Sequence, residues 1–476
     1  QLRRDFAEKY DVEFTNMGGT APSDPAEVAD EFRATLAAVA SVMERDTDLV
    51  EYLSDRLVEL GERVPETVSG FKLGLKGNPL ADARVTDVGS YPEELFKKPG
   101  EKAANRAGLA AWGAWINSFG ATEYDQPLVI GASADLAGST NIKGFADGFG
   151  DFEGWGWYER KGGPDGTLLP TEITEFSNAG IVASMTTVNF ARDPEKEFLG
   201  FYGSTSTYGS FSYLKYGPLR LYSQLAQDTP FKMGKFIWVA GHSGPETADD
   251  SRTHFGIFSP GVTQLFPRGK IINLYPWEYN EVPVLLGTAL ATDVPLIALH
   301  LTRPAIEIPD RAKLGMPSHF EAARGAYVVR DVAPGSPRAG TLFVQGTSAM
   351  RSVVELLPRI EAEGLNVKIV CVTSPELFDL QPAEYRDLVV TPADQADSTV
   401  ITTQARWLMQ RWLLNPIAEE YALSSDYDDA WRTGGSLEEV IDEARLSPEW
   451  VWKGIVRFTD EREARIARLK RQFEGL

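Results

Sequence analysis

The sequence predicts an α/β protein with two doubly wound domains whose sheets are mainly parallel, preceded by a helical region. Three observations lead to this fold class. Apolar residues recur at helical spacing within the first hundred residues. From about Glu101 onward, short apolar runs alternate with helical stretches instead. The chain of 476 residues, 43% of them hydrophobic and 24% charged, is long enough to bury more than one core.

The first region, residues 1–100, is expected to be a helical N-terminal or linker region. A helix is predicted from Pro25 to Met43, because apolar residues stand at helical spacing at Val28, Phe32, Leu36, Val39 and Val42. A second helix is predicted from Asp48 to Leu60. Neither helix carries an obvious chemical motif.

Two α/β domains are expected to follow, at residues 101–310 and 318–476. The predicted strands of the first are Leu128 to Gly131, Phe198 to Tyr202, Phe236 to Ala240, Ile271 to Leu274 and Pro295 to Leu299. Those of the second are Ala326 to Val329, Thr341 to Val344, Val367 to Val372 and Leu388 to Val390. An amphipathic helix is predicted from Ser348 to Glu363.

Charge and composition argue against several classes of protein. The 47 basic and 68 acidic residues give a net charge of -21, so neither a nucleic acid nor an anionic membrane is an expected partner. No segment reaches about 18 uninterrupted apolar residues, and the first residues are charged, so we expect a soluble cytoplasmic protein. The single cysteine, Cys371, lies in an apolar run and is expected to be a buried thiol in a reducing compartment.

The strongest local signal for chemistry is a loop that contains two of the four histidines, His242 and His254. This loop follows a predicted parallel strand, and ligands of open α/β sheets bind beyond the carboxyl ends of strands. Asp249 and Asp250 precede His254, and a carboxylate within reach would orient an imidazole for acid–base work. Solvated or locally satisfied side chains are the alternative. A metal has little support, since no third His or Cys is nearby in the sequence.

A second candidate segment, residues 133–141, follows the first predicted strand. Its small residues would let backbone N–H groups approach a ligand, while Asp135 offers an acceptor and Ser139 a donor. An ordinary turn and helix cap would use the same residues.

Glu175 and a group of aromatic residues form the remaining candidates. Glu175 begins a predicted helix of small residues, where it could simply stabilise the helix dipole or could be a buried carboxyl that shares a proton. The Gly-, Ser- and Thr-rich run that follows Tyr202 suits a stacking platform for a flat ring, although core packing is the usual role of such residues. Its aromatic members are Tyr202, Tyr208, Phe211, Tyr213 and Tyr216.

Taken in order, these motifs resemble the transketolase family of thiamine-diphosphate enzymes, specifically its pyrimidine-binding and C-terminal domains. The resemblance extends over roughly Glu101 to Leu476. Residues 133–139 are similar to the SADLxxSN signature of that family, with Gly138 and Thr140 as departures. Residues 173–175 occupy the place of its IREH motif, with Phe176 where the family has His.

Two further motifs carry the resemblance. His242 and residues 250–254 reproduce the spacing of the family's H...DGPTH loop, with Ser251 and Arg252 in place of Gly and Pro. Residues 377–386 are close to the FdxQxxxYR stretch of the transketolase C-terminal domain.

The resemblance implies a role for each matching residue. It implies that Glu175 contacts the aminopyrimidine ring nitrogen of thiamine diphosphate and shares a proton with it. It places Tyr208 and Phe211 around the pyrimidine ring and Asp135 near the cofactor. His242, Asp250 and His254 would bind sugar hydroxyls and relay protons. The implied ligands of the sugar's terminal phosphate are Arg106, Ser139 and Arg303.

The GDG motif and following Asn that hold the metal and diphosphate in this family have no counterpart that we find in the sequence. The resemblance therefore implies the pyrimidine and C-terminal half of a transketolase that transfers a two-carbon ketol unit between sugar phosphates. We expect no metal ligand here and no activity for the chain alone. A separate pyrophosphate-binding subunit would hold Mg²⁺ or Ca²⁺. A heterotetramer with self-association is expected, with residues 173–184 and the aromatic run at the interface.

Two alternatives stay open. The chain could be the β-type subunit of a 2-oxo-acid dehydrogenase E1 component, which shares the domain pair; the histidine spacing and residues 378–386 argue against it. It could also be a non-catalytic scaffold of the same fold, which the departures at Gly138, Phe176, Ser251 and Arg252 would allow.

Overall fold

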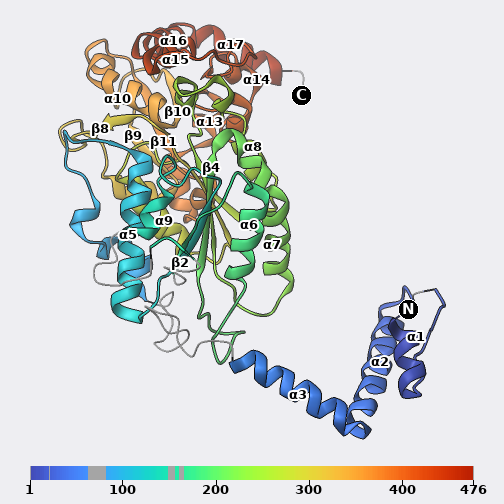
Figure 1. Cartoon of the computed structure of the whole chain (residues 1–476). Helices are drawn as coiled ribbons and strands as arrows, with labels where there is room; N and C mark the ends of the chain where they lie inside the picture. The colour runs from blue at the N-terminus through green and yellow to red at the C-terminus, as the bar shows by residue number, and fades with distance from the viewer. Residues whose placement is uncertain (1, 21, 63–81, 148–155, 160–165, 475–476) are drawn as a thin grey trace. The chain divides into compact units, whose positions relative to one another are not determined.

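The computed structural model of the chain describes residues 2–20, 22–62, 82–147, 156–159 and 166–474 (Figure 1). The chain divides into two compact units, Gln1–Val68 and Ser69–Leu476. In the part of the chain that is described, no helix is long and apolar enough to cross a membrane.

The first unit consists of helices. They are α1 (Leu2–Tyr10), α2 (Pro25–Arg45) and α3 (Thr47–Glu62). The two helices predicted from the sequence correspond to α2 and α3 and are confirmed. Asp24 caps α2, because its carboxylate accepts from the backbone N–H groups of Ala26 at 2.9 Å and Glu27 at 3.2 Å. Residues 63–81 of the predicted N-terminal region lie outside the described residues.

The second unit contains two larger sheets, and its first sheet has six parallel strands in the order β3-β2-β4-β5-β7-β6. These strands are β2 (Val129–Ser133), β3 (Leu168–Leu169), β4 (Tyr202–Tyr208), β5 (Phe236–Gly241), β6 (Ile271–Leu274) and β7 (Leu296–His300). The helices around this sheet are α4 (Ala83–Thr86), α5 (Asn105–Tyr124), α6 (Glu175–Thr186), α7 (Tyr216–Asp228), α8 (Pro260–Thr263) and α9 (Glu281–Leu290). A short antiparallel pair joins β1 (Lys102–Ala104) to β8 (Ala305–Glu307).

Helices cover both faces of this sheet, as a doubly wound fold requires (Figure 1). On β5, Phe236 and Trp238 pack with α6 and α7, whereas Ile237 and Val239 pack with α5 and α9. Successive side chains of a strand point to opposite faces, and here both faces are apolar. The α/β prediction with mainly parallel sheets is thus confirmed.

The second sheet has five strands in the order β13-β12-β10-β11-β9. They are β9 (Ala326–Arg330), β10 (Gly340–Gln345), β11 (Val367–Val372), β12 (Ser398–Thr402) and β13 (Leu423–Ser424), and only the β9–β11 pair is antiparallel. Its helices are α10 (Thr347–Ala362), α11 (Pro375–Asp379), α12 (Ala383–Val389), α13 (Pro392–Ala396), α14 (Pro416–Glu419), α15 (Leu437–Glu443), α16 (Pro448–Asp460) and α17 (Arg462–Phe473). The two sheets lie within the predicted domain limits, but Tyr91 and Leu95 also join this unit's core, so the three-part division stays a prediction.

Two predicted strands were wrong. The strand predicted at Phe198 to Tyr202 is displaced, because β4 starts at Tyr202 and continues through the small polar residues to Tyr208. The strand predicted at Leu388 to Val390 is instead the end of α12, and the strand beside β10 is β12. Apolar runs alone therefore located the long apolar strands, but not β4 and β12, which are rich in Ser and Thr, nor the short strands β1, β3, β8 and β13.

Candidate functional site

The candidate site lies where β2, β4, β5 and β7 end, because parallel strands place their carboxyl ends at one edge of the sheet. His242 follows β5 directly and has a left-handed backbone with φ of 61°. The chain then passes through two short 3-10 turns, Pro245–Asp249 and Arg252–His254. This path returns His254 to the edge where His242 lies.

Tyr208 connects the two histidines. Its ring centroid lies 4.3 Å from that of His242 and 4.7 Å from that of His254. Phe211 contacts His254 at 5.8 Å between ring centroids. The loop histidines and the first two predicted aromatic residues thus form one cluster at the ends of β4 and β5.

Arg106, in the first turn of α5, holds His242 in a defined state. Its Nη1 donates to His242 Nε2 at 2.6 Å and to the Ser139 carbonyl at 2.5 Å. Burial, together with Arg106 and Arg303, lowers the pKa of His242 to about 3. His242 is therefore neutral, and because Nε2 accepts, its proton must be on Nδ1, a buried atom with no partner among the described residues.

His254 is oriented by a carboxylate. Its Nδ1 lies 3.0 Å from Asp250 Oδ2, which leaves Nε2 as the other ring nitrogen. Burial acts to raise the pKa of Asp250, but the hydrogen bond from His254 and the charge of Arg303 outweigh it and lower that pKa. Arg303 Nη1 pairs with Asp249 at 2.9 Å and with Asp250 at 3.5 Å. The predicted residue Arg303 thus joins the histidine loop through two aspartates.

Glu175 is buried, with 5% of its surface exposed, at the start of α6. Its Oε1 accepts from Thr207 Oγ1 at 3.0 Å. Thr207 immediately precedes Tyr208 on β4, so the carboxyl lies at the same strand end as the aromatic cluster. Within the described part of the chain, Glu175 forms no hydrogen bond or ion pair with either imidazole.

The other predicted residues do not all join the histidine cluster. Ser139 donates through Oγ to the Leu136 carbonyl at 3.2 Å, and its own carbonyl accepts from Arg106. Asp135 is exposed on a left-handed turn after β2, and its side chain pairs with none of the described residues. The five predicted aromatic residues do not form one platform: Tyr202 is in the core and Tyr216 packs on Phe266.

Sequence reasoning missed two buried titratable residues near these strands. Lys215 Nζ donates to the carbonyls of Thr205 at 3.1 Å and Val239 at 2.8 Å, which fixes the segment carrying Phe211 to the sheet. Burial lowers the pKa of Lys215 well below its usual value. His300, at the end of β7, is stacked on Tyr275, and burial lowers its pKa to about 3. A lone lysine within an aromatic run was the signal available in the sequence.

No group of three or more His, Cys, Asp or Glu residues that could hold a metal ion occurs within the described residues. What the site provides is a neutral histidine, a carboxylate-oriented histidine, two arginines and a buried carboxyl. This set can hydrogen-bond a polyhydroxylated ligand and attract an anionic group.

Comparison with known proteins shows a similarity to transketolases. Residues 325–424 match the family model of the transketolase-like C-terminal domain. The transketolase of Geobacillus stearothermophilus is 26% identical over 373 residues, which cover 78% of this chain and 48% of that protein. The chain is thus similar to transketolases over most of its length, and it spans about half the length of the curated relatives it matches.

Solved structures agree on the fold. A transketolase from Leishmania mexicana aligns with a TM-score of 0.60 and 16% identity, over 93% of this chain and 55% of that one. A split-gene transketolase described as an inactive beta4 tetramer aligns over 76% of this chain and 100% of its own, with 16% identity. Its TM-score of 0.47 is too low to carry an argument about assembly.

Proposed function

We propose that this chain is the pyrimidine-binding and C-terminal half of a thiamine-diphosphate-dependent transketolase. It would transfer a two-carbon ketol unit between sugar phosphates once assembled with a separate pyrophosphate-binding chain. The observation that carries the proposal is the cluster in which Tyr208 contacts both His242 and His254 while Arg106 binds His242.

The residues present fit the pyrimidine end of the cofactor. Glu175, at the start of α6, is a buried carboxyl that accepts from Thr207 near the end of β4, and Tyr208 and Phe211 follow Thr207 along the chain. When bound, thiamine diphosphate supplies the carbon that carries the two-carbon unit. Glu175 would share a proton with the ring nitrogen, an interaction that is strong because water is excluded there.

The two histidines offer different hydrogen-bonding groups, so they are suited to different hydroxyls of the sugar. His242 presents a buried Nδ1–H as a donor, because Arg106 occupies Nε2. His254 is held by Asp250 through Nδ1, so Nε2 would accept or return a proton. Arg106 would bind a terminal phosphate through its remaining N–H groups. Arg303 would first have to break its ion pairs with Asp249 and Asp250.

Two features support assembly with other chains. The match to only 48% of the Geobacillus stearothermophilus transketolase is consistent with a separate pyrophosphate-binding partner. In addition, α6 and α7 carry an apolar exposed face, on which Phe176 and Leu221 are each 61% exposed. Phe176 follows Glu175, so self-association through this face would occur beside the proposed cofactor site.

The test is reconstitution with the candidate pyrophosphate-binding chain, thiamine diphosphate and Mg²⁺. We expect ketol transfer from a ketose phosphate to an aldose phosphate only on mixing, and its loss in Glu175→Gln. Glu172→Gln is the matched control, because Glu172 is exposed three residues earlier. Full activity in Glu175→Gln would refute the role of that carboxyl.

The same preparation separates the alternatives. Turnover of pyruvate or a branched 2-oxo acid instead of ketose phosphate would identify an E1-type subunit. Failure of the assembled complex to bind the cofactor, measured by calorimetry, would favour a non-catalytic scaffold.

A further inference from the structure

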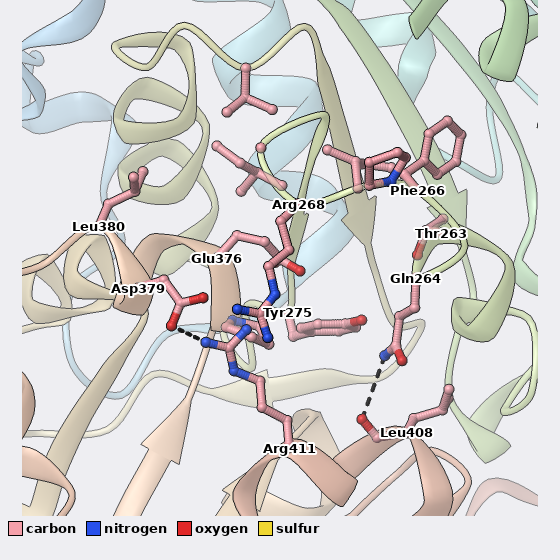
Figure 2. Close-up of a pocket in the computed structure, with 16 residues that line it drawn as sticks. Thr263, Gln264, Phe266, Arg268, Tyr275, Glu376, Asp379, Leu380, Leu408 and Arg411 are labelled. Carbon is pink, nitrogen blue, oxygen red and sulfur yellow. Dashed lines mark hydrogen bonds and ion pairs between the residues drawn. The ribbon is translucent and has the colours of Figure 1, made fainter. Parts of the chain in front are cut away.

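A cavity of about 300 Å³ lies away from the histidine cluster, between the edge strand β6 and the carboxyl ends of β11 and β12 (Figure 2). Glu376, from α11, covers the edge of β6, because its Oε2 accepts from the Asn273 backbone N–H at 3.0 Å. The carboxyl ends of strands in an open α/β sheet are where ligands bind. A cavity of this size is within the range of small-molecule sites.

Tyr275 contributes a polar group that the protein itself does not satisfy. The residue is 3% exposed, and its buried hydroxyl has no hydrogen-bond partner among the described residues. Figure 2 shows the hydroxyl directed toward Gln264. That amide affects the pKa of Tyr275 but does not reach hydrogen-bond geometry, and it donates to the Leu408 carbonyl at 3.5 Å instead. A buried hydroxyl without a partner is unfavourable, so it is a candidate donor to a ligand.

Arg268 supplies an uncompensated positive charge at the same cavity. None of the described residues forms a hydrogen bond or ion pair with its guanidinium, and Figure 2 shows the side chain reaching toward the middle of the cavity, as does Arg411. Arg411 is paired with Asp379. Glu376 is satisfied by Asn273 and is buried, which raises its pKa. Arg268 is therefore the arginine of this cavity that pairs with no carboxylate among the described residues.

The remaining wall is apolar and would exclude water from the body of a ligand. The residues that form it are Phe266, Ile271, Ile272, Val294, Leu380 and Leu408. Ile271 and Ile272 come from the edge strand β6, whereas Leu380 and Leu408 come from the second sheet's loops. Both halves of the cavity thus belong to the unit Ser69–Leu476.

We propose that this cavity binds a small organic anion: a flat apolar body against these walls, a carboxylate or phosphate on Arg268, and a hydrogen bond from the Tyr275 hydroxyl. The site uses no residue of the proposed catalytic cluster, and it does not depend on the proposed function. Carboxylate and phosphate share the chemistry that the arginine recognises, and the experiment separates them.

The test is calorimetric titration of the full chain, without cofactor and at constant ionic strength, with benzoate, phenyl phosphate and the neutral benzamide. We expect at least one anion to bind at least tenfold more tightly than benzamide. Arg268→Gln should weaken that anion about tenfold, and Tyr275→Phe about three- to tenfold. Arg351→Gln, an exposed arginine on α10, should leave the affinity unchanged.

Preferential binding of benzoate identifies a carboxylate site, and preferential binding of phenyl phosphate identifies a phosphate site. Equal binding of benzamide, unchanged affinity in Arg268→Gln, or no binding of either anion overturns the proposal. If the melting temperature shows that Tyr275→Phe is misfolded, Arg268→Gln still decides, because its side chain lies at the exposed mouth.

Discussion

Replacing Arg106 by Met should change the protonation of His242. The pKa of His242 is about 3, which is about 3.5 below its ordinary 6.5, and burial is the largest cause, followed by Arg106 and Arg303. At about 1.36 kcal/mol for each pKa unit, the full difference is on the order of 5 kcal/mol. Only the part due to Arg106 disappears in Arg106→Met.

The contact distance sets the size of that part. Two unit charges 4 Å apart interact with about 4 kcal/mol at an effective dielectric constant of 20, which is equivalent to roughly 3 pKa units. The Nη1 to Nε2 distance is 2.6 Å, but burial persists in the variant and is the larger cause. We therefore expect the pKa of His242 to rise by about 1 to 2 units.

The measurement is an NMR titration of ¹³C-labelled histidines from pH 8 to 4.5, with His242 assigned through His242→Gln. The four histidines make the spectrum simple. In the wild type the His242 signal should stay constant and report a proton on Nδ1, while in Arg106→Met it should begin to move near pH 5. Arg351→Met is the control. A wild-type midpoint near pH 6.5, or no change in Arg106→Met, would refute the reasoning.

Three other predictions concern stability and assembly. His242 and His300 have pKa values of about 3 when folded and about 6.5 when unfolded, so their contribution to stability is complete above pH 6.5 and is lost toward pH 3. Each histidine should make the free energy of unfolding fall by up to about 1.4 kcal/mol per pH unit in this range. In urea unfolding, His300→Leu should show a smaller dependence on pH, by the uptake of one proton, and an unchanged dependence would contradict the prediction. Burial lowers the pKa of Lys215 well below its usual 10.5, so the free energy of unfolding should rise as the pH increases toward 10.5, by up to about 1.4 kcal/mol per pH unit. Lys215→Met should lack this increase, and equal slopes in the two proteins would contradict the prediction. Leu221→Glu should weaken self-association in sedimentation velocity, whereas Leu388→Glu, at a residue that is 70% exposed on α12, should not. Equal effects of the two substitutions would argue against the α6–α7 face.

Strand β4, which sequence reasoning displaced, shows why patterning could predict only part of the fold. β5 is a continuous apolar run and β11 is interrupted only by Lys368, but β4 contains Gly, Ser and Thr and is nevertheless entirely buried. Among its hydroxyls, Ser206 bonds Thr140 at 2.7 Å and Ser133 at 2.9 Å, whereas those of Ser204 and Thr205 have no partner among the described residues. Since those partners are distant in the sequence, a local pattern could not separate this strand from a loop.

The site was predictable to the extent that local order encodes it. His242, Asp250 and His254 follow one strand, so their spacing indicated a loop that folds back. The Arg106–His242 hydrogen bond joins residues 136 positions apart and depends on how α5 packs beside β5. Its geometry therefore comes from tertiary structure, even though the resemblance had marked both residues.

Ser251 shows that a departure from the transketolase motif need not displace the histidine that follows it. Its Oγ accepts from the Thr253 backbone N–H at 3.3 Å, and its carbonyl accepts from the His254 N–H at 2.8 Å. This serine-capped turn does the work expected of Gly and Pro, because His254 remains 3.0 Å from Asp250 and in contact with Tyr208. Phe176 differs in kind: it replaces a polar histidine with an exposed ring on the apolar α6 face. The turn at Ser251 thus keeps His254 beside Asp250 and Tyr208, whereas Phe176 adds an exposed ring beside Glu175, so we expect the surface for assembly to be the feature that these departures change most.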